Sequence, residues 1–207
     1  MSHYSAIQIP EDQITRLKKG DRPALAMVYQ ALSGVVYSMA LRILANPDAA
    51  SGVTQDTFLS VMEKIGTLSH HSAFVGWVRR IAMNHCLMRL RAAKDQNGGR
   101  HLSYPDPDGS QNRHLEADVS ARGMSSERLD GLADIERALN TLMPETRMVV
   151  WLHEVEGLTH REIAQLFGRS PSFSKSQLAR GYAQLKKTFH GDPNEEGNES
   201  RQQHDTA

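Results

Sequence analysis

Two acid-free stretches carry the clearest chemical signal in the chain. Residues 73–94 contain no Asp or Glu but five cations, and residues 168–189 repeat this pattern. Lys plus Arg and Asp plus Glu are equal at 24 each, so the signal lies in the distribution of charge and not in its sum. Two separated basic patches on a neutral chain suggest two contacts with one polyanion. The cations are Arg79, Arg80, Arg89, Arg91 and Lys94, and then Arg169, Lys175, Arg180, Lys186 and Lys187.

The second basic stretch lies in a pattern typical of two short helices joined by a tight turn. Thr159 and Glu162 fit a capping box, in which each side chain bonds the backbone amide of the other residue. Gly168 is placed to end that helix in a left-handed conformation. Ser170 and Pro171 then suit the N-cap and the first position of a second helix. The local chemistry therefore predicts a helix-turn-helix.

The second helix of this pattern has two distinct faces. Leu178, Tyr182 and Leu185 cluster on one side at 100° per residue and should pack inward. A short polar and basic face suits the major groove of DNA, where Arg reads guanine and apolar groups meet the thymine methyl. An ordinary helical hairpin with a solvated basic face remains the alternative. The residues of the candidate DNA face include Phe173, Ser176, Arg180 and Lys187.

The composition is that of a folded protein without an internal disulfide. Apolar residues make up 39% of the 207 residues and charged residues 23%, as in globular chains. Cys86 is the only cysteine, which fits a reducing compartment. The N-terminal segment has no apolar core of signal-peptide length, and no segment is expected to span a bilayer. We therefore expect a cytoplasmic protein without membrane insertion.

Helical periodicity divides the chain into two all-α blocks. Residues 14–94 carry apolar stripes at helical spacing, and residues 131–189 form the second helical block. Between them, residues 95–130 are rich in Gly, Pro, Ser and charge and have few apolar anchors, so they are expected to form a linker. Residues 190–207 are a polar tail. The expected stripes are Val53, Thr57, Val61 and Ile65 with Phe58 beside them, and Phe74, Trp77, Val78, Ile81 and Met88.

Both blocks resemble one family, the extracytoplasmic-function sigma factors of the sigma-70 family. The segment "LMPETRMVVWLHEVEGLTHREIAQLFGRSPSFSKSQLARGYAQLKK" resembles their region 4. "TQDTFLSVMEKI" is similar to the Gln-acid-x-Phe helix of their region 2, and "FVGWVRRIAMNHCLMRLR" to its Trp-x-x-x-Ile-Ala-x-Asn segment. Two motif sets in the right order around a variable linker are more specific than either alone.

The resemblance implies a sigma factor that binds core RNA polymerase through its β and β′ subunits and directs initiation at promoter DNA. Region 2 would bind the polymerase clamp and open the −10 element, and region 4 would bind the flap and read the −35 element. By position, Val53, Gln55, Asp56 and Phe58 fall on the polymerase-facing helix. The −10 set is Ser72, Phe74, Trp77, Arg79, Arg80 and Asn84. The −35 set is Arg169, Ser172, Phe173, Lys175, Ser176, Gln177 and Arg180.

The chain departs from the family pattern at several positions. Ser51 and Gly52 stand where an acidic pair usually precedes the region 2 helix. Met88 stands where Asp is common, and its place on the apolar stripe suggests that it packs inward. In the recognition helix, "SPSFSKSQ" replaces Gly-Thr-Val-Lys-Ser-Arg, so that Phe173 and Gln177 replace a Thr and an Arg, and Ser174 occupies a position that is usually apolar. An unusual −35 sequence is therefore expected.

Other functions fit the sequence less well. A free-standing helix-turn-helix regulator would usually need a dimer to bind two half-sites, and no dimerisation stripe is visible. A metal-dependent enzyme is disfavoured because "HEVEG" at His153 lacks the second His of a zincin helix, and His70–His71 and His85–Cys86 have no spaced partner pair. We therefore expect no cofactor and no catalysis by this chain alone. Control by an anti-sigma factor stays open.

Overall fold

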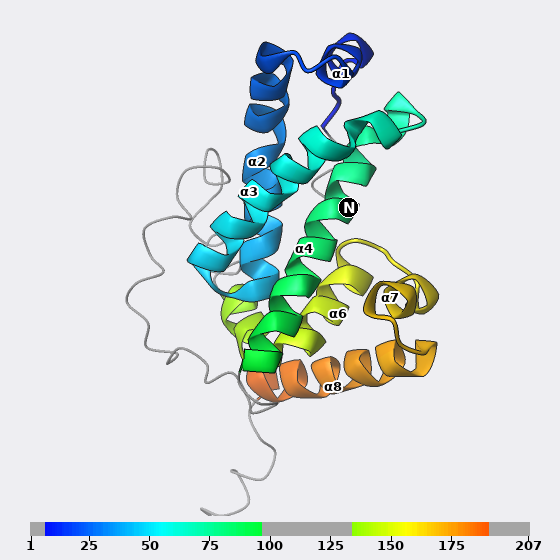
Figure 1. The fold of residues 1–207 in the computed structure, drawn as a ribbon. Coiled ribbons are helices and arrows are strands. Elements are labelled where there is room, and N and C mark those ends of the chain that lie inside the picture. Colours follow the sequence, from blue (N-terminus) through cyan, green and yellow to red (C-terminus); the bar gives the residue numbers. More distant parts are fainter. Residues whose placement is uncertain (1–6, 97–133, 191–207) are drawn as a thin grey trace, which may run out of the picture.

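The computed structural model describes residues 7–96 and 134–190, and in these ranges it contains helices, turns and loops but no strand (Figure 1). The all-α prediction is confirmed. The expected linker at 95–130 and the tail at 190–207 lie almost entirely outside the described residues. The first block contains α1 (Glu11–Lys18), α2 (Arg22–Leu44), α3 (Pro47–Lys64), the short 3-10 turns η2 (Ile65–Thr67) and η3 (His71–Ala73), and α4 (Phe74–Gln96). The second contains helical residues 134–140, α6 (Pro144–Glu154), α7 (His160–Phe167) and α8 (Pro171–His190).

Short polar side chains set where the long helices of the first block begin. The Asp21 side chain accepts a hydrogen bond from the amide of Ala24, and the Asn46 side chain accepts one from the amide of Ala49 at 2.8 Å. Each of these N-caps is followed by a proline in the first turn, where the missing amide proton costs nothing. Between α2 and α3, Ala45 adopts a left-handed conformation with φ of 49°. Ala45 and Asn46 therefore form the corner between α2 and α3, which pack against each other.

The core of the first block lies among α2, α3 and α4. The expected stripe of α3 is buried in full: Val53, Thr57, Val61 and Ile65, with Phe58 beside them. Met88 is exposed over 60% of its surface, so its predicted inward packing is wrong. Leu87 and Leu90 occupy the buried positions on that turn of α4, and Met88 falls between them on the solvent side.

The core of the second block lies where α6, α7 and α8 meet. Leu178 is buried there and Leu185 is partly buried, as expected, whereas Tyr182 is 48% exposed and its predicted inward packing is wrong. The residue that faces α6 at this point is Gly181, because the two helices approach too closely for a side chain. Tyr182 stands beside the crossing, and its hydroxyl donates a hydrogen bond to the carboxylate of Glu154.

The two blocks pack against each other, which the sequence did not predict. Helix α2 contacts α6, and one hydrophobic core continues from the first block into the second. Figure 1 shows α4 between α3 on one side and the α6–α7 pair on the other. Helix α2 is also the one described helix long and apolar enough to cross a membrane. A core helix passes the same test, and Val28, Leu32 and Val36 of α2 are fully buried in the protein.

Candidate nucleic-acid interfaces

The helix-turn-helix forms at residues 159–190 with the predicted local geometry. The amide of Glu162 donates to Thr159 Oγ1 at 3.3 Å, and the amide of Thr159 donates to Glu162 Oε2 at 2.8 Å, which completes the capping box. Gly168 ends α7 with φ of 64°, a conformation that disfavours residues with a Cβ. Helix α8 begins at Pro171. The capping box thus fixes where α7 begins, and the glycine turn fixes where it ends before α8.

Helix α8 divides the predicted −35 residues into an outward and an inward set. Ser172, Lys175, Ser176 and Arg180 are exposed, and Arg169 is exposed in the turn before the helix. Phe173 is half-buried, with its ring centroid 5.4 Å from that of Phe167. Gln177 is buried and faces α6 instead of the outward surface. The structure therefore brings five of the seven residues to one solvent-facing surface and places two against the domain interior.

Two buried polar contacts hold α8 in place, and the sequence did not reveal them. Thr146 Oγ1 donates to Gln177 Oε1 at 2.6 Å, and Ser174 Oγ lies 3.0 Å from His160 Nδ1. Because buried polar groups are costly without hydrogen-bond partners, each pair favours one rotation of α8 about its axis. The signal that could have found them is the inward position of Ser174 and Gln177 on the helical wheel.

Most of the predicted −10 residues lie along one edge of α4 and the turn before it. Ser72, Arg80 and Asn84 are exposed, and Trp77 is half-buried. Phe74 is buried in the core, with its ring centroid 6.2 Å from that of Trp77. Phe74 therefore supports the indole of Trp77 from inside the domain. Arg79 Nη1 donates to Glu156 Oε2 of the second block at 3.0 Å.

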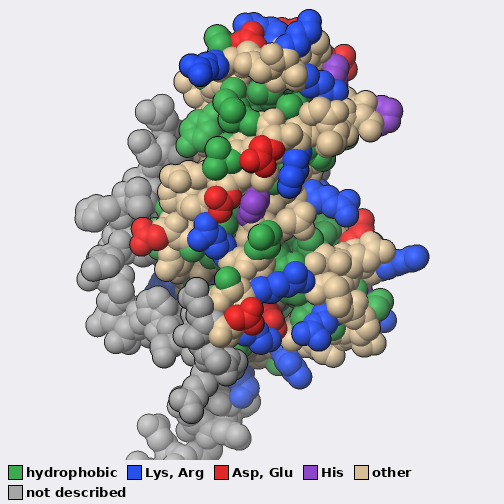
Figure 2. Space-filling view, viewed as in Figure 1, with side chains coloured by type: hydrophobic (Ala, Val, Ile, Leu, Met, Phe, Trp, Pro, Cys, Tyr) green, Lys and Arg blue, Asp and Glu red, His purple; other side chains and the backbone are tan. Residues whose placement is uncertain are grey.

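The predicted polymerase-facing helix, α3, also has an outer and an inner side. Gln55 is exposed and Asp56 is half-exposed, whereas Val53 and Phe58 are buried. The apolar residues of the outer surface were not predicted from the sequence. Figure 2 shows hydrophobic side chains gathered where α2 meets α3. The large exposed apolar residues of these two helices are Tyr29, Leu59 and Met62, at 44%, 58% and 52% exposure.

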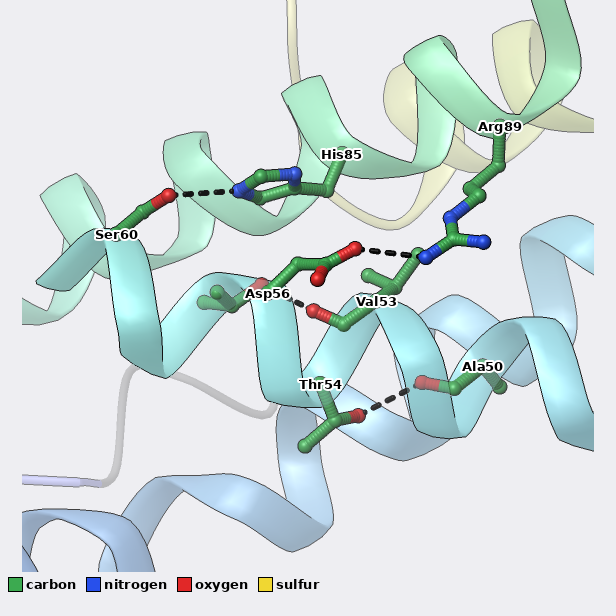
Figure 3. A network of polar contacts seen from close by, with 8 residues as sticks. Ala50, Val53, Thr54, Asp56, Ser60, His85 and Arg89 are labelled. Atoms are coloured by element: carbon green, nitrogen blue, oxygen red, sulfur yellow. Dashed lines mark hydrogen bonds and ion pairs between the residues drawn. The ribbon is translucent and has the colours of Figure 1, made fainter. Parts of the chain in front are cut away.

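A network of polar contacts joins α3 to α4 near Ser51 and Gly52, the two residues that stand where an acidic pair is usual (Figure 3). Arg89 Nη2 donates to Asp56 Oδ2 at 2.8 Å and lies 3.1 Å from the place where a Cβ on Gly52 would stand. Gly52 thus leaves room for the Arg89 guanidinium above α3. One turn further along, Ser60 Oγ lies 3.0 Å from His85 Nε2, and burial lowers the pKa of His85. At the two positions where an acidic pair is usual, the chain therefore has small residues, and Arg89 of the neighbouring helix α4 lies over Gly52.

The described residues hold no cluster of three or more His, Cys, Asp or Glu side chains that could bind a metal ion. Cys86 is buried, and burial raises the pKa of its thiol to about 12, so the thiolate needed for nucleophilic or metal chemistry is disfavoured at neutral pH. The described surface instead offers two polar helical faces and one apolar patch.

Comparison with known proteins identifies both blocks. The family model described as "Sigma-70 region 2" matches residues 28–96, and the one described as "Sigma-70, region 4" matches residues 132–185. The ECF RNA polymerase sigma factor SigE of Mycolicibacterium smegmatis is 30% identical over 151 residues, which cover 73% of this chain and 56% of SigE. SigW of Bacillus subtilis is 24% identical over 181 residues, covering 84% of this chain and 94% of SigW.

A solved structure resembles the chain at the level of the fold. The sigma factor RpoE of Bartonella quintana, in complex with the anti-sigma factor NepR, has a TM-score of 0.50 at 19% identity. That match covers 81% of this chain and 97% of RpoE. CnrH in complex with the cytosolic domain of CnrY has a TM-score of 0.49 at 20% identity, over 87% of this chain and 96% of CnrH.

Proposed function

The chain belongs to the sigma-70 family as an extracytoplasmic-function sigma factor, and we propose that it directs promoter-specific initiation through three surfaces of its two blocks. It partners core RNA polymerase and promoter DNA. The observation that supports the proposal is that the segments matched by region 2 and region 4 each fold into helices, and that α4 and α8 in them each expose a polar side. RNA synthesis would belong to the polymerase, and this chain would act in the cytoplasm without catalysis of its own.

We propose that the outward face of α8 reads the −35 element. The exposed set offers hydroxyls at Ser172 and Ser176 between the cations Lys175 and Arg180. Hydroxyls and Arg can bond base edges in the major groove, and Lys suits the flanking phosphates. Phe173 and Gln177 would act from inside the domain, by setting the rotation of α8.

For the −10 element we propose the edge of α4. Opening a duplex requires a surface that holds an unstacked base and cations that follow the released strand. Trp77 offers an aromatic face that Phe74 supports, and Arg80 and Asn84 are exposed beside it. Arg79 would join them when its contact with Glu156 is open.

Polymerase docking is proposed for the outer side of α3 together with α2. Gln55 and Asp56 are predicted contacts there, and Tyr29, Leu59 and Met62 add an apolar area next to them. An apolar centre with a polar rim is the usual composition of a protein interface. Val53 and Phe58 would hold α3 in place from the core, where the Phe58 ring centroid lies 4.8 Å from that of Tyr29.

Gel filtration with sigma-free core polymerase tests the central proposal. We expect co-elution at equal stoichiometry at moderate salt, and promoter-dependent transcription from the complex. Separate elution, combined with retained binding to duplex DNA, would favour a free-standing helix-turn-helix regulator instead.

A further inference from the structure

The proposed −10 residues begin in a short segment, residues 68–73, that connects the 3-10 turn η2 to helix α4. Its regular structure is the single turn η3. Its backbone hydrogen bonds are local: the amide of Leu68 donates to Ile65 O, and the amide of Ala73 donates to His70 O, both at 3.1 Å. Single 3-10 turns have poor hydrogen-bond geometry and add little stability of their own. The conformation of the 68–73 segment therefore depends on the elements that it contacts.

Helix α1 supplies such a contact from far away in the sequence. Lys18 Nζ donates a hydrogen bond to the carbonyl oxygen of Leu68 at 2.8 Å, although the two residues are 50 positions apart. At the other end of α1, Glu11 Oε2 lies 4.0 Å from His71 Nδ1. Helix α1 contacts both η2 and η3, and Figure 1 shows it at the same end of the first block as the connection between α3 and α4. The helix thus reaches the 68–73 segment on both of its sides.

The position of α1 is itself fixed by the core. Ile14 and Leu17 are 1% and 4% exposed, so the helix has one buried face. Arg16 Nε donates to Asp21 Oδ2 at 2.7 Å, and Asp21 caps the start of α2, which ties the end of α1 to the next helix. Because Leu17 directly precedes Lys18, its burial limits the directions open to the Lys18 side chain. The ammonium group therefore meets Leu68 from a fixed support.

The far end of the 68–73 segment is held in a different way. It runs into Phe74, which is buried at the start of α4 and lies against Trp77. Between the two anchored ends, Ser69, His70 and Ser72 are exposed. A binding segment that is already held in place loses less conformational entropy when its ligand arrives. The segment is thus built as a rim of fixed shape beside the Trp77 indole.

We propose that Lys18 is a positioning residue for opening of the −10 element: by holding the Leu68 carbonyl, it keeps the 68–73 segment in the shape that receives an unstacked base. The proposal rests on the −10 function proposed above for α4 and the turn before it. The region 2 family model matches residues 28–96, so α1 lies before the matched segment. Without the ammonium, the carbonyl of the buried Leu68 loses its partner, and the segment must move to find another.

The first test measures the order of the segment in the free chain by hydrogen exchange and mass spectrometry. Lys18→Met keeps the length and the apolar stem of the side chain but removes the donor. We expect amide exchange in peptides that span residues 66–73 to become about five- to tenfold faster, because a hydrogen bond from a charged donor is lost. Lys18→Arg retains a donor and should restore much of the protection. The matched control is Lys19→Met, which makes the same change of charge at the exposed neighbour and should exchange like the wild type. Equal exchange in Lys18→Met and Lys19→Met would overturn the proposal.

The second test measures promoter opening by the complete holoenzyme. The probe is a promoter selected from random-sequence duplexes by the wild-type holoenzyme, and permanganate reactivity of its thymines reports unpaired bases. We expect Lys18→Met to lower the rate of opening about tenfold, because the base-receiving segment must be ordered during the reaction. Affinity for core polymerase and for a duplex that carries only the −35 element should stay at the wild-type value. Loss of all three properties together would indicate general damage to the fold, and unchanged opening would show that the contact does not act on the −10 element. Either result would overturn the positioning role.

Failure of this inference and failure of the proposed function are distinguishable. A wild-type chain that neither co-elutes with core polymerase nor opens a promoter would refute the proposed function itself. A wild-type chain that opens the promoter, with a Lys18→Met variant that opens it equally fast, would refute the role of Lys18 alone.

Discussion

Ser174 and His160 join the two helices of the helix-turn-helix from the inside, with Ser174 Oγ 3.0 Å from His160 Nδ1. Ser174 is fully buried, and the His160 ring stacks on that of His153 with centroids 4.6 Å apart. A buried hydroxyl without a partner costs free energy, so His160 makes a polar residue acceptable where family members usually have an apolar one. The polar Ser174 of the recognition helix is thus matched by His160 of the helix that supports it.

Replacing this hydroxyl should weaken the domain. We expect Ser174→Ala to lower the free energy of unfolding by about 1 kcal/mol, because His160 loses its buried partner. The matched control is Ser172→Ala, at an exposed position of the same helix, which should change stability by less than about 0.5 kcal/mol. Urea unfolding followed by far-UV circular dichroism measures both. Equal midpoints for the two variants would show that the contact contributes nothing.

The crossing of α8 over α6 should tolerate no side chain at Gly181. A Cβ there would lie 2.5 Å from Val150 Cγ2 and 3.2 Å from Thr146 Cγ2. We expect Gly181→Ala to destabilise the chain by about 1–3 kcal/mol, because the helices must move apart. Gly76→Ala is the matched control, and we expect it to raise the free energy of unfolding instead of lowering it. Gly76 is also helical but has open space around its Cβ position, so alanine should add about 0.5–1 kcal/mol of stability. Thermal unfolding of both variants checks the contrast.

Much of the fold could be predicted from sequence because its signals are local. The capping box at Thr159, the glycine turn at Gly168 and the start of α8 at Pro171 depend on neighbouring residues, and all three form as expected. Met88 and Tyr182 were assigned to the wrong side because a helical stripe gives only an approximate direction. Leu87 and Leu90 fill the core beside Met88, and the close approach of α6 decides the position of Tyr182.

The candidate site was less predictable, because its geometry depends on contacts between distant residues. The family resemblance placed Gln177 on the DNA side of α8, but Thr146 is 31 positions away in the chain and bonds Gln177 from inside. The contact between Arg79 and Glu156 joins residues 77 positions apart. No helical period or local motif records either pair. The apolar area at Leu59 and Met62 was missed for another reason, since single exposed apolar residues look the same in sequence as core residues.

Cys86 should make the free energy of unfolding fall as the pH becomes alkaline. Burial raises the pKa of its thiol from 9.0 to about 12, so the folded chain keeps a proton that the unfolded chain releases. Its contribution to stability is therefore fully present below pH 9.0 and is lost as the pH rises toward 12. We expect the free energy of unfolding to fall less steeply over this range in Cys86→Ala than in the wild type. Parallel slopes in the two proteins would contradict the assignment to this thiol.

The DNA affinity of Arg180→Ala should show whether Arg180 bonds a base or a phosphate. It is exposed at the edge of the α8 face, where either role is geometrically open. If Arg180 bonds a base, Arg180→Ala should weaken binding to the preferred −35 sequence by about 1–3 kcal/mol and reduce the preference over other sequences. An equal loss on every duplex would assign Arg180 to the phosphates. Lys175→Ala serves as the comparison. We expect it to lose the same amount of binding free energy on every duplex, and its DNA binding to depend less on salt than that of the wild type.

The apolar patch on α2 and α3 should contribute to polymerase binding through its area. Met62 and Met88 are a matched pair, with 52% and 60% of their surfaces exposed, but only Met62 lies in the patch. We expect Leu59→Ala with Met62→Ala to weaken the complex with core polymerase by about 1–3 kcal/mol, because two apolar side chains lose their buried contacts at the interface. Met88→Ala should leave the affinity unchanged within about 0.5 kcal/mol. A competition assay with labelled sigma factor and core polymerase measures both affinities. A loss in Met88→Ala equal to that in the double variant would place the polymerase contact on α4 as well. Retained affinity in the double variant would remove the patch from the interface.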